Sequence, residues 1–231
     1  MTTIRFDQVS LEAATHEGVL RILTDVDLTL TEHRVALIGA NGSGKSTLAR
    51  LVNGLAEPSQ GSVLVDDVDV ARHGRHVRRR VAFAFSEPAA QLVMPTVIED
   101  VALSLRRQIS DRDERDAATL QVLARFGLAE LAYRSVHALS GGQKQLTALA
   151  GVLATDPDIL VADEPTTLLD LRNARLVADR LFGLRQQLLL VTHDLEMAER
   201  CDRVVLLEDG RVVADGPASD VVAQYRQSAV T

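Results

Sequence analysis

A glycine-rich stretch at residues 39–47 constrains the fold of this chain more than any other feature. Its sequence, GANGSGKST, matches the pattern G-x-x-x-x-G-K-[ST] in full. The apolar run at 35–38 before it is typical of a strand buried on both faces of a sheet. Residues 46–55 after it have helical character. Because a strand, a glycine loop and a helix follow one another, we predict a loop whose backbone N–H groups wrap a phosphate.

The residue types of this loop suit a nucleotide and a metal ion. Glycines let the backbone approach phosphate oxygens, and the positive end of the following helix adds attraction. We expect the Lys45 ammonium to reach the β- and γ-phosphates and the Ser46 hydroxyl to bind Mg²⁺. A chance match to a glycine-rich turn is the alternative, and the flanking strand and helix argue against it. The residues predicted to bind the nucleotide are Gly39, Asn41, Gly42, Ser43, Gly44, Lys45, Ser46 and Thr47.

A second hydrophobic run, at 159–162, ends in two carboxylates, Asp163 and Glu164. Ligands of open α/β sheets bind at the carboxyl ends of the strands, so we expect these acids beside the phosphate loop. Asp163 is suited to hold Mg²⁺, directly or through water, and Glu164 to polarise an attacking water. Taken alone, the pair would be an ordinary acidic helix start after a strand. The phosphate loop makes the catalytic interpretation the better one.

The order of apolar runs predicts an α/β fold. Strands alternate with helices along much of the chain, which implies parallel β-α-β units. Helical spacing dominates from about 96 to 155, where we predict a helical subdomain inserted into the sheet. A chain of 231 residues, 46% of them hydrophobic, is long enough for one such domain over 1–231 with a substantial core.

Charge and cysteine content narrow the class of protein. The net charge of −7 argues against nucleic acid as a partner, because proteins that bind its phosphate backbone are usually basic. No stretch approaches the roughly 18 apolar residues that cross a bilayer, and the start lacks the apolar core of a signal peptide. The single cysteine, Cys201, is typical of a reducing compartment. We therefore expect a cytosolic location, with any membrane contact made through a partner.

The stretch LSGGQKQ at 139–145 distinguishes among the families that have such a phosphate loop. It resembles the signature motif of ATP-binding-cassette (ABC) ATPases, and the resemblance covers essentially the whole chain. It implies a P-loop NTPase of the RecA-like type, with a mostly parallel core, an N-terminal antiparallel β subdomain and the inserted helical subdomain. It also implies ATP hydrolysis with Mg²⁺. In this family the motif faces a nucleotide held by the opposite subunit, so the expected contacts across a dimer are Ser140, Gly141, Gly142 and Gln143.

Two further motifs follow in the order of the family. Asp170 resembles the D-loop aspartate that helps couple the two sites of the dimer. His193, in the stretch VTHD, resembles the switch histidine that contacts the γ-phosphate, whereas a lone histidine after a strand would more often be structural. The resemblance thus implies Glu164, His193 and Lys45 as catalytic residues. Because the signature motif and Glu164 are both intact, we expect a homodimer with two competent sites.

Two positions depart from the family pattern. A glutamine that senses Mg²⁺ and the transmembrane partner usually follows the strand at 81–85, and here that position holds Ser86. Serine can bind water or metal, so Ser86 is kept as a metal-site candidate, and Gln91 is not assigned this role. The aromatic residue that stacks on adenine is replaced by His16 or Ala13, depending on the alignment. An imidazole can stack on a purine, which makes His16 the candidate.

The stretch PAAQLVMPTVIEDV at 88–101 is similar to the corresponding part of energy-coupling-factor (ECF) ATPases, which serve importers of vitamins and of cobalt or nickel ions. In that family a groove beside this segment receives arginine-bearing coupling helices. Glu87, Glu99 and Asp100 are candidate acidic partners, although a solvated helix start explains the last two equally well. The resemblance implies a transmembrane T-component and a substrate-binding S-component as partners, and a peripheral location at the cytoplasmic face of the cell membrane.

A short cassette of this kind resembles the ATPase of biotin importers, because many ECF ATPases carry several dozen additional C-terminal residues. Cobalt or nickel import is the first alternative. An exporter or conventional importer cassette is a further alternative, which the stretch at 91–101 disfavours but does not exclude. A soluble ABC protein not coupled to transport belongs to another class and is disfavoured by a single cassette without coiled coils. The basic run at 72–80 is expected to be a solvated face rather than a contact for lipid headgroups.

Overall fold

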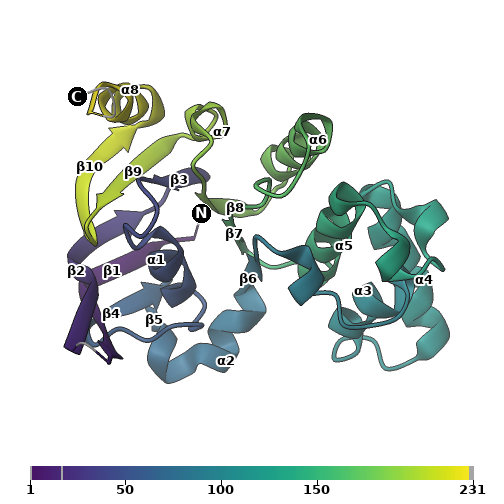
Figure 1. Cartoon of the computed structure of the whole chain (residues 1–231). Coiled ribbons are helices and arrows are strands. Elements are labelled where there is room, and N and C mark those ends of the chain that lie inside the picture. The colour runs from purple at the N-terminus through teal and green to yellow at the C-terminus, as the bar shows by residue number, and fades with distance from the viewer. Residues whose placement is uncertain (1, 17, 229–231) are drawn as a thin grey trace. The chain divides into compact units, whose positions relative to one another are not determined.

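A computed structural model describes residues 2–16 and 18–228 of the chain (Figure 1). Its contacts divide it into two compact units. Unit 1 comprises Met1–Val81, Asp158–Asp163 and Arg185–Thr231, and unit 2 comprises Ala82–Pro157 and Glu164–Leu184. The helical subdomain predicted at about 96–155 therefore lies inside unit 2, which begins earlier and includes a second segment of the chain. The prediction of a single domain over 1–231 stays a prediction.

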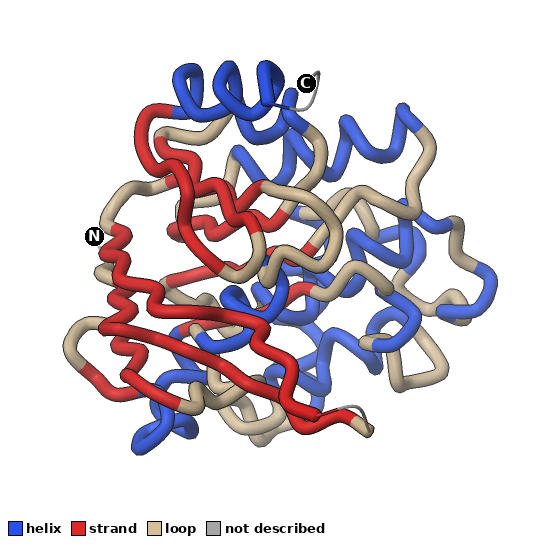
Figure 2. The backbone as a smooth tube through the Cα atoms, turned by 60° about the vertical axis from the view of Figure 1, so that its left-hand side comes forward, coloured by secondary structure: helices blue, strands red, loops and turns tan. Residues whose placement is uncertain are grey.

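An antiparallel sheet is built from the first part of unit 1. Its strands have the order β2-β1-β4-β5, and every neighbouring pair is antiparallel. Two long strands, β1 and β2, form one hairpin of this sheet (red in Figure 2). Apolar residues alternate along β1, which buries one face of the sheet. The strands are β1 (Ile4–Thr15), β2 (Gly18–Leu30), β4 (Gln60–Val65) and β5 (Val68–Asp69).

A second sheet forms the centre of unit 1, with the order β10-β9-β3-β8-β7. The pairs β3–β8, β3–β9 and β7–β8 are parallel, and β9–β10 is antiparallel. Every residue of β3, β7 and β8 is buried, as expected for parallel strands covered on both faces. The predicted mostly parallel core is thus confirmed. The strands are β3 (Arg34–Ile38), β7 (Ile159–Asp163), β8 (Gln187–Val191), β9 (Arg203–Glu208) and β10 (Arg211–Pro217), and β6 (Val81–Ala84) leads into unit 2.

Helices of unit 1 pack beside these sheets: α1 (Lys45–Leu51), α2 (Val70–Arg80), α7 (Leu195–Glu199) and α8 (Ala218–Ser228). Helix α2 contains the basic run, which sequence analysis had described only as a solvated face. Asp69 caps its start by accepting a hydrogen bond from the Arg72 backbone. Most of its arginines are exposed, but Arg80 is only 27% exposed and pairs with Asp66 and Asp158. The last arginine of the run thus belongs to the fold and not to the solvated face.

Unit 2 is mainly helical, and a side chain caps the start of each α-helix. The caps of α3, α4, α5 and α6 are Thr96, Asp111, Ser140 and Asp170. Helix α3 packs against α4 and α5, and α5 packs against α6. Within the described part of the chain, no helix has the length and apolar character needed to cross a membrane. The helices are η1 (Pro88–Ala90), α3 (Val97–Leu105), α4 (Arg112–Arg125), η2 (Ala129–Leu131), η3 (Val136–Ala138), α5 (Gly141–Leu153) and α6 (Leu171–Phe182).

Candidate nucleotide-binding site

The phosphate loop joins β3 to α1 in a conformation that requires glycine. Gly39 has φ of 138°, and a Cβ there would lie 2.1 Å from the Leu207 carbonyl oxygen of β9. Gly44, the residue before α1, has φ of 97°, and a Cβ would lie 2.8 Å from a Leu23 methyl group. Both a positive φ and close packing therefore exclude side chains at these two positions. The surrounding strands hold the loop against the sheet.

Two polar side chains are buried within this loop. The Lys45 ammonium donates to the carbonyl oxygens of Gly39 and Ala40, at 2.9 and 2.7 Å. Among the residues that the structure describes, the buried Ser43 hydroxyl finds no hydrogen-bond partner. A buried polar group without a partner is costly, and a phosphate oxygen would supply one. Asn41 and Gly42 are exposed at the rim, so the loop can receive a phosphate from solvent.

The predicted metal ligands Ser46 and Asp163 are brought together within unit 1. The Ser46 hydroxyl donates to Asp163 Oδ1 at 2.7 Å, which joins the first turn of α1 to the end of β7. Asp163 is 3% exposed, and its Oδ2 lies 3.6 Å from a guanidinium nitrogen of Arg50. Hydroxyl and carboxylate oxygens are the hard ligands that Mg²⁺ prefers, so the pair fits this ion. Arg50 is not among the site residues predicted from the sequence, although it lies one helical turn after Ser46.

Glu164 has an unusual backbone conformation, with φ of 50° directly after β7. A left-handed conformation is strained for a residue other than glycine, and such strain is concentrated at functional sites. The Thr167 hydroxyl donates to Glu164 Oε2 at 2.8 Å, which constrains the carboxylate. Thr167 is a contact that sequence analysis missed. The assignment of Glu164 as the base stays a prediction.

The signature motif forms the start of α5 as a capping box. Ser140 Oγ accepts from the Gln143 backbone at 3.3 Å, and Gln143 Oε1 accepts from the Ser140 backbone at 2.9 Å. A Cβ on Gly142 would lie 2.5 Å from Asn173 Oδ1 of α6, so a side chain at this position would collide with that helix. Gly141 has Leu168 and Leu169 as its nearest neighbours. The motif is therefore packed directly against the segment that contains Asp170.

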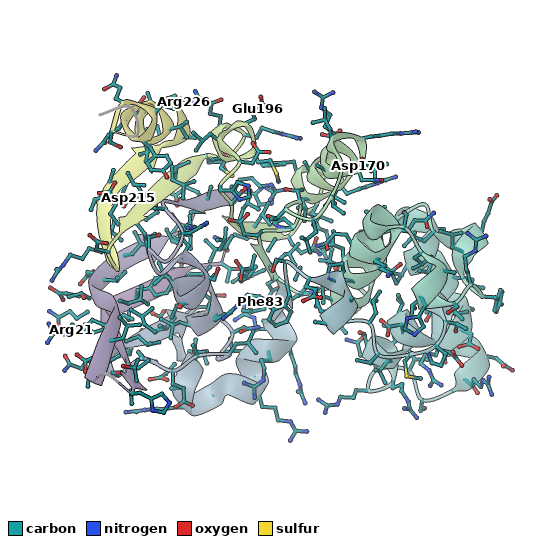
Figure 3. The ribbon with its side chains drawn as sticks, in the orientation of Figure 1. Arg21, Phe83, Asp170, Glu196, Asp215 and Arg226 are labelled. Atoms are coloured by element: carbon teal, nitrogen blue, oxygen red, sulfur yellow. The ribbon has the colours of Figure 1, made fainter. Side chains whose placement is uncertain are left out.

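Asp170 caps α6, at whose start it is labelled in Figure 3. Its carboxylate accepts from the Asn173 backbone at 2.9 Å and from the Asn173 amide at 2.7 Å. These hydrogen bonds favour the charged form and hold the pKa of Asp170 below its usual value. Asn173, which sequence analysis missed, thus contacts both Asp170 and Gly142. The coupling role of Asp170 stays a prediction, and its structural role is that of a helix cap.

His193 is exposed and lies two residues after Val191, the last residue of β8. Its neighbour Thr192 is fixed on both sides, because its N–H donates to the Leu37 carbonyl and its hydroxyl accepts from the Asp194 N–H. Leu37 belongs to β3, the strand that leads into the phosphate loop, and pairs with Val191. His193 therefore leaves the sheet at the same edge as the loop, as the switch assignment requires.

The role of His16 at the adenine stays a prediction. His16 lies in the exposed turn of the β1–β2 hairpin, whereas Ile22 and Leu23 of that hairpin lie beside Gly44 of the phosphate loop. The strand from Gly18 to Leu23 spans about 17 Å at 3.3 Å per residue. Ala13, which the other alignment places at the adenine-stacking position, pairs with Leu20 and lies closer to the loop along the strand.

Ser86, the remaining metal-site candidate, follows β6 in unit 2 and is half-buried. Its place after the strand agrees with sequence analysis. Its role at a metal stays a prediction.

Known proteins share this sequence and fold. Residues 23–167 match the family model described as ABC transporter. The chain is 44% identical to the biotin transport ATP-binding protein BioM of Rhizobium etli, over 92% of this chain and 94% of that protein. A relative in Bartonella quintana, 43% identical over 97% of this chain and 98% of that protein, bears only the general description of an ABC transporter ATP-binding protein.

Two solved structures share the fold over most of their length. The post-hydrolysis dimer of the ATP-binding cassette MJ0796 with ADP and Pi has a TM-score of 0.83 and 28% identity, and covers 93% of this chain and 98% of that chain. The second is cbiO1 from Clostridium perfringens, which is part of the ABC transporter complex cbiONQ. It has a TM-score of 0.82 and 28% identity, and covers 97% of this chain and 92% of that chain. The phosphate loop, the buried polar side chains around it and these matches together show that the chain belongs to the ABC transporter family, as an ATP-binding subunit that hydrolyses ATP.

Proposed function

We propose that this chain is the ATPase of an ECF-type importer that takes up biotin. The observation that carries the proposal is its 44% identity to a biotin transport ATP-binding protein over nearly the whole of both chains. A second relative with that name, in Rhodobacter capsulatus, is 40% identical over 88% of this chain. In this proposal two copies form a Mg²⁺-dependent homodimer at the cytoplasmic face of the cell membrane. The proposed partners are a transmembrane T-component and a substrate-binding S-component, with no role for nucleic acid.

A groove in unit 2 supports a membrane partner. It has a volume of about 510 Å³ and lies beside α3. Apolar side chains line it, and Tyr133, which is 76% exposed, stands at its surface. Exposed aromatic and aliphatic side chains around a groove are typical of a site that receives an amphipathic helix. The lining also includes charged side chains of both signs, which add specificity. The lining residues include Leu103 and Tyr133 and the charged residues Glu99, Arg106, Arg112 and Asp116.

Only some of the acidic residues expected to contact such a helix are exposed. Asp100 is buried, and its carboxylate accepts hydrogen bonds from the Val93 and Met94 backbones, so the expectation that it meets a partner's arginine is wrong. Glu99 lines the groove and is exposed, although it accepts a hydrogen bond from the Thr96 hydroxyl. Glu87 is exposed directly before η1. The proposal therefore rests on Glu99 as the acidic contact within the groove.

Copurification and uptake test this proposal together. A tagged chain, expressed with the membrane components encoded beside it, should recover a T-component and an S-component. Proteoliposomes holding that complex should accumulate radiolabelled biotin only when ATP and Mg²⁺ are supplied. Recovery of neither membrane component would support the soluble-protein alternative. Uptake of cobalt or nickel ions in place of biotin would retain the importer and replace its substrate.

A charge reversal examines the groove itself. Glu99→Arg should abolish recovery of the T-component, because an arginine would repel the expected arginine of the partner. Glu208→Arg, an equally drastic change at an exposed site in unit 1, is the matched control and should leave recovery intact. Equal recovery with both variants would exclude the groove as the docking site.

A further inference from the structure

Helix α2 carries the largest concentration of positive charge in the sequence. It contains no acidic residue, whereas the whole chain has a net charge of −7. Of its basic side chains only that of Arg80 is less than fully exposed, because it pairs with carboxylates of the fold. The positive charge is therefore gathered on one element. The basic residues of α2 are Arg72, His73, Arg75, His76, Arg78, Arg79 and Arg80.

Three of these arginines share one face of the helix. The backbone bends at His73, where φ is −123° and ψ is 29°, and is helical after that residue. In this second part Arg75, Arg78 and Arg79 are three and four residues apart, which places them side by side. Val77 lies two residues from both Arg75 and Arg79 and is 1% exposed, so it marks the opposite side, where α2 packs against β4 and β5. We call Arg75, Arg78 and Arg79 the arginine face.

No carboxylate neutralises the arginine face. Among the residues that the structure describes, none of its three guanidinium groups forms an ion pair. The acids nearest to α2 are already engaged. Asp66 and Asp158 both pair with Arg80, while Asp69 caps the helix and lies 3.7 Å from the guanidinium of Arg72. The arginine face is thus left with its full positive charge.

The helix itself does not stabilise this arrangement. Like charges three or four residues apart repel one another and destabilise a helix. The helix dipole favours Arg78 and Arg79 in the last turn, but Arg75 lies outside that turn. Gly74 weakens the helix further, and its missing side chain leaves room for Arg78, whose Nη1 would lie 2.8 Å from a Cβ there. A bound anion would offset the repulsion among the three guanidinium groups.

The surface of α2 suits phosphate groups better than a protein or a nucleic acid. A guanidinium can bind two phosphate oxygens through parallel hydrogen bonds. Apart from Ala71, every exposed side chain of α2 is basic, so the helix lacks the large apolar anchors of a protein interface. It also lacks Phe, Tyr and Trp rings on which bases stack. Its 11 residues span only about 16 Å, and a long polyanion would also meet the acidic remainder of the chain.

We propose that the arginine face binds the phosphate headgroups of anionic lipids. The contact is electrostatic and stays at the bilayer surface, because the two valines of α2, Val70 and Val77, are buried in unit 1 and cannot enter the membrane. It would hold unit 1 with α2 toward the bilayer. The inference rests on the proposed function in one respect, because an importer subunit works beside a membrane. It replaces the solvated face that the sequence favoured.

Cosedimentation of the isolated subunit with vesicles tests the proposal without the importer. Vesicles of phosphatidylcholine and phosphatidylglycerol should bind the chain, and vesicles of phosphatidylcholine alone should not. Each arginine at an anionic surface strengthens binding by about fivefold, so Arg75→Gln, Arg78→Gln and Arg79→Gln together should weaken it by about 100-fold. Lysine at the same three positions keeps the charge and should retain most of the binding. Salt at about 1 M should release the chain, because the Debye length is then about 3 Å.

The matched control removes three exposed arginines from another helix. Arg172, Arg175 and Arg180 of α6 lie in unit 2, and their replacement by glutamine changes the net charge by the same amount. Binding to anionic vesicles should then change by less than about threefold. Equal binding by the two triple variants, or no binding by the unaltered chain, would overturn the proposal. Displacement from the vesicles by inorganic phosphate, or a preference for an RNA oligonucleotide, would overturn the assignment to lipid.

Energy transfer to labelled lipid headgroups tests the orientation. Cys201 is buried, so a fluorophore can be attached at Ala71→Cys on α2 or at Ser219→Cys on α8, which lies at the other end of unit 1 (Figure 1). On anionic vesicles the label on α2 should transfer more energy than the label on α8. Equal transfer from both would overturn the orientation. Failure of biotin import would remove the proposed function, whereas both vesicle experiments would still decide whether α2 binds lipid.

Discussion

The Ser46 hydroxyl and the buried Asp163 carboxylate are 2.7 Å apart, so the phosphate loop and the end of β7 share one hydrogen bond where Mg²⁺ is expected. Ser46→Ala removes an oxygen ligand and should lower ATP hydrolysis by about 100-fold, as expected when transition-state charge loses its stabilisation. Ser46→Thr retains the hydroxyl and should keep most of the activity. Hydrolysis rates over a Mg²⁺ titration measure both. A fully active Ser46→Ala variant would contradict the assignment.

Arg50 should weaken Mg²⁺ binding, because its positive charge lies 3.6 Å from Asp163 Oδ2. The Arg50 side chain is 46% exposed, so solvent screens its charge, and Arg50→Met should lower the half-saturating Mg²⁺ concentration by about two- to fivefold. Titration of Mn²⁺ binding by electron paramagnetic resonance in the presence of ATP measures the effect without turnover. Arg72→Met, at another exposed arginine of unit 1, is the control. A weaker metal affinity in Arg50→Met would reverse the inferred sign.

Glu164→Gln should bind ATP but hydrolyse it at least about 100 times more slowly, because an amide cannot act as the general base. In the proposed homodimer, ATP that is not hydrolysed should hold the two subunits together. Size-exclusion chromatography with ATP should therefore show a lasting dimer for this variant and a transient one for the unaltered chain. Thr167→Ala, which removes only the hydroxyl that contacts Glu164, should have a smaller effect. Normal turnover in Glu164→Gln would remove Glu164 from the base role.

The parts of the site that could be predicted are those encoded by local sequence. The loop at 39–47 is one, because positions such as Gly39 admit only glycine in the conformation that the sheet imposes. Contacts that depend on a distant partner could not be predicted. Asn173 meets Gly142 only after α5 and α6 pack together, and nothing in its own neighbourhood indicates this.

Two misinterpretations have clear physical reasons. The basic run of α2 was not predicted as a helix because only two apolar residues, Val70 and Val77, mark its buried face. Asp100 was considered a surface acid because a carboxylate near a helix start is usually solvated. Here the chain before α3 folds back, so that two backbone N–H groups reach the carboxylate and make its burial favourable.

The pair of Arg80 and Asp66 should make the stability of unit 1 depend on acid pH. Burial alone would raise the pKa of Asp66, but hydrogen bonds from the Thr3 N–H and from Arg80 outweigh it, so the pKa lies below its usual value of 3.8. The stabilisation is therefore complete above pH 3.8 and is lost as the pH falls through the lower pKa of the folded state. Asp66→Asn should cost about 1 kcal/mol at neutral pH and progressively less in acid.

Urea unfolding over a pH series measures this dependence. Asp67→Asn is the matched control, because Asp67 occupies the same turn with a positive φ but is 89% exposed. Its substitution should change the free energy of unfolding by less than about 0.5 kcal/mol at every pH. An equal loss in both variants would assign the effect to the turn and not to the contact with Arg80.

Cys201 should be inert in the folded protein. Burial raises the pKa of its thiol to about 12 from 9.0, and only the thiolate reacts with maleimides. A difference of three pKa units, 12 minus 9, lowers the thiolate fraction at pH 8 by about 1000-fold, so labelling should be slow until a denaturant unfolds the chain. The same shift implies that stability falls as the pH rises above 9, where the unfolded thiol ionises and the folded one does not. A Ser219→Cys variant, with its new thiol exposed on α8, is the control and should label at once. Rapid labelling of Cys201 in the unaltered native chain would show that the segment between α7 and β9 opens to solvent.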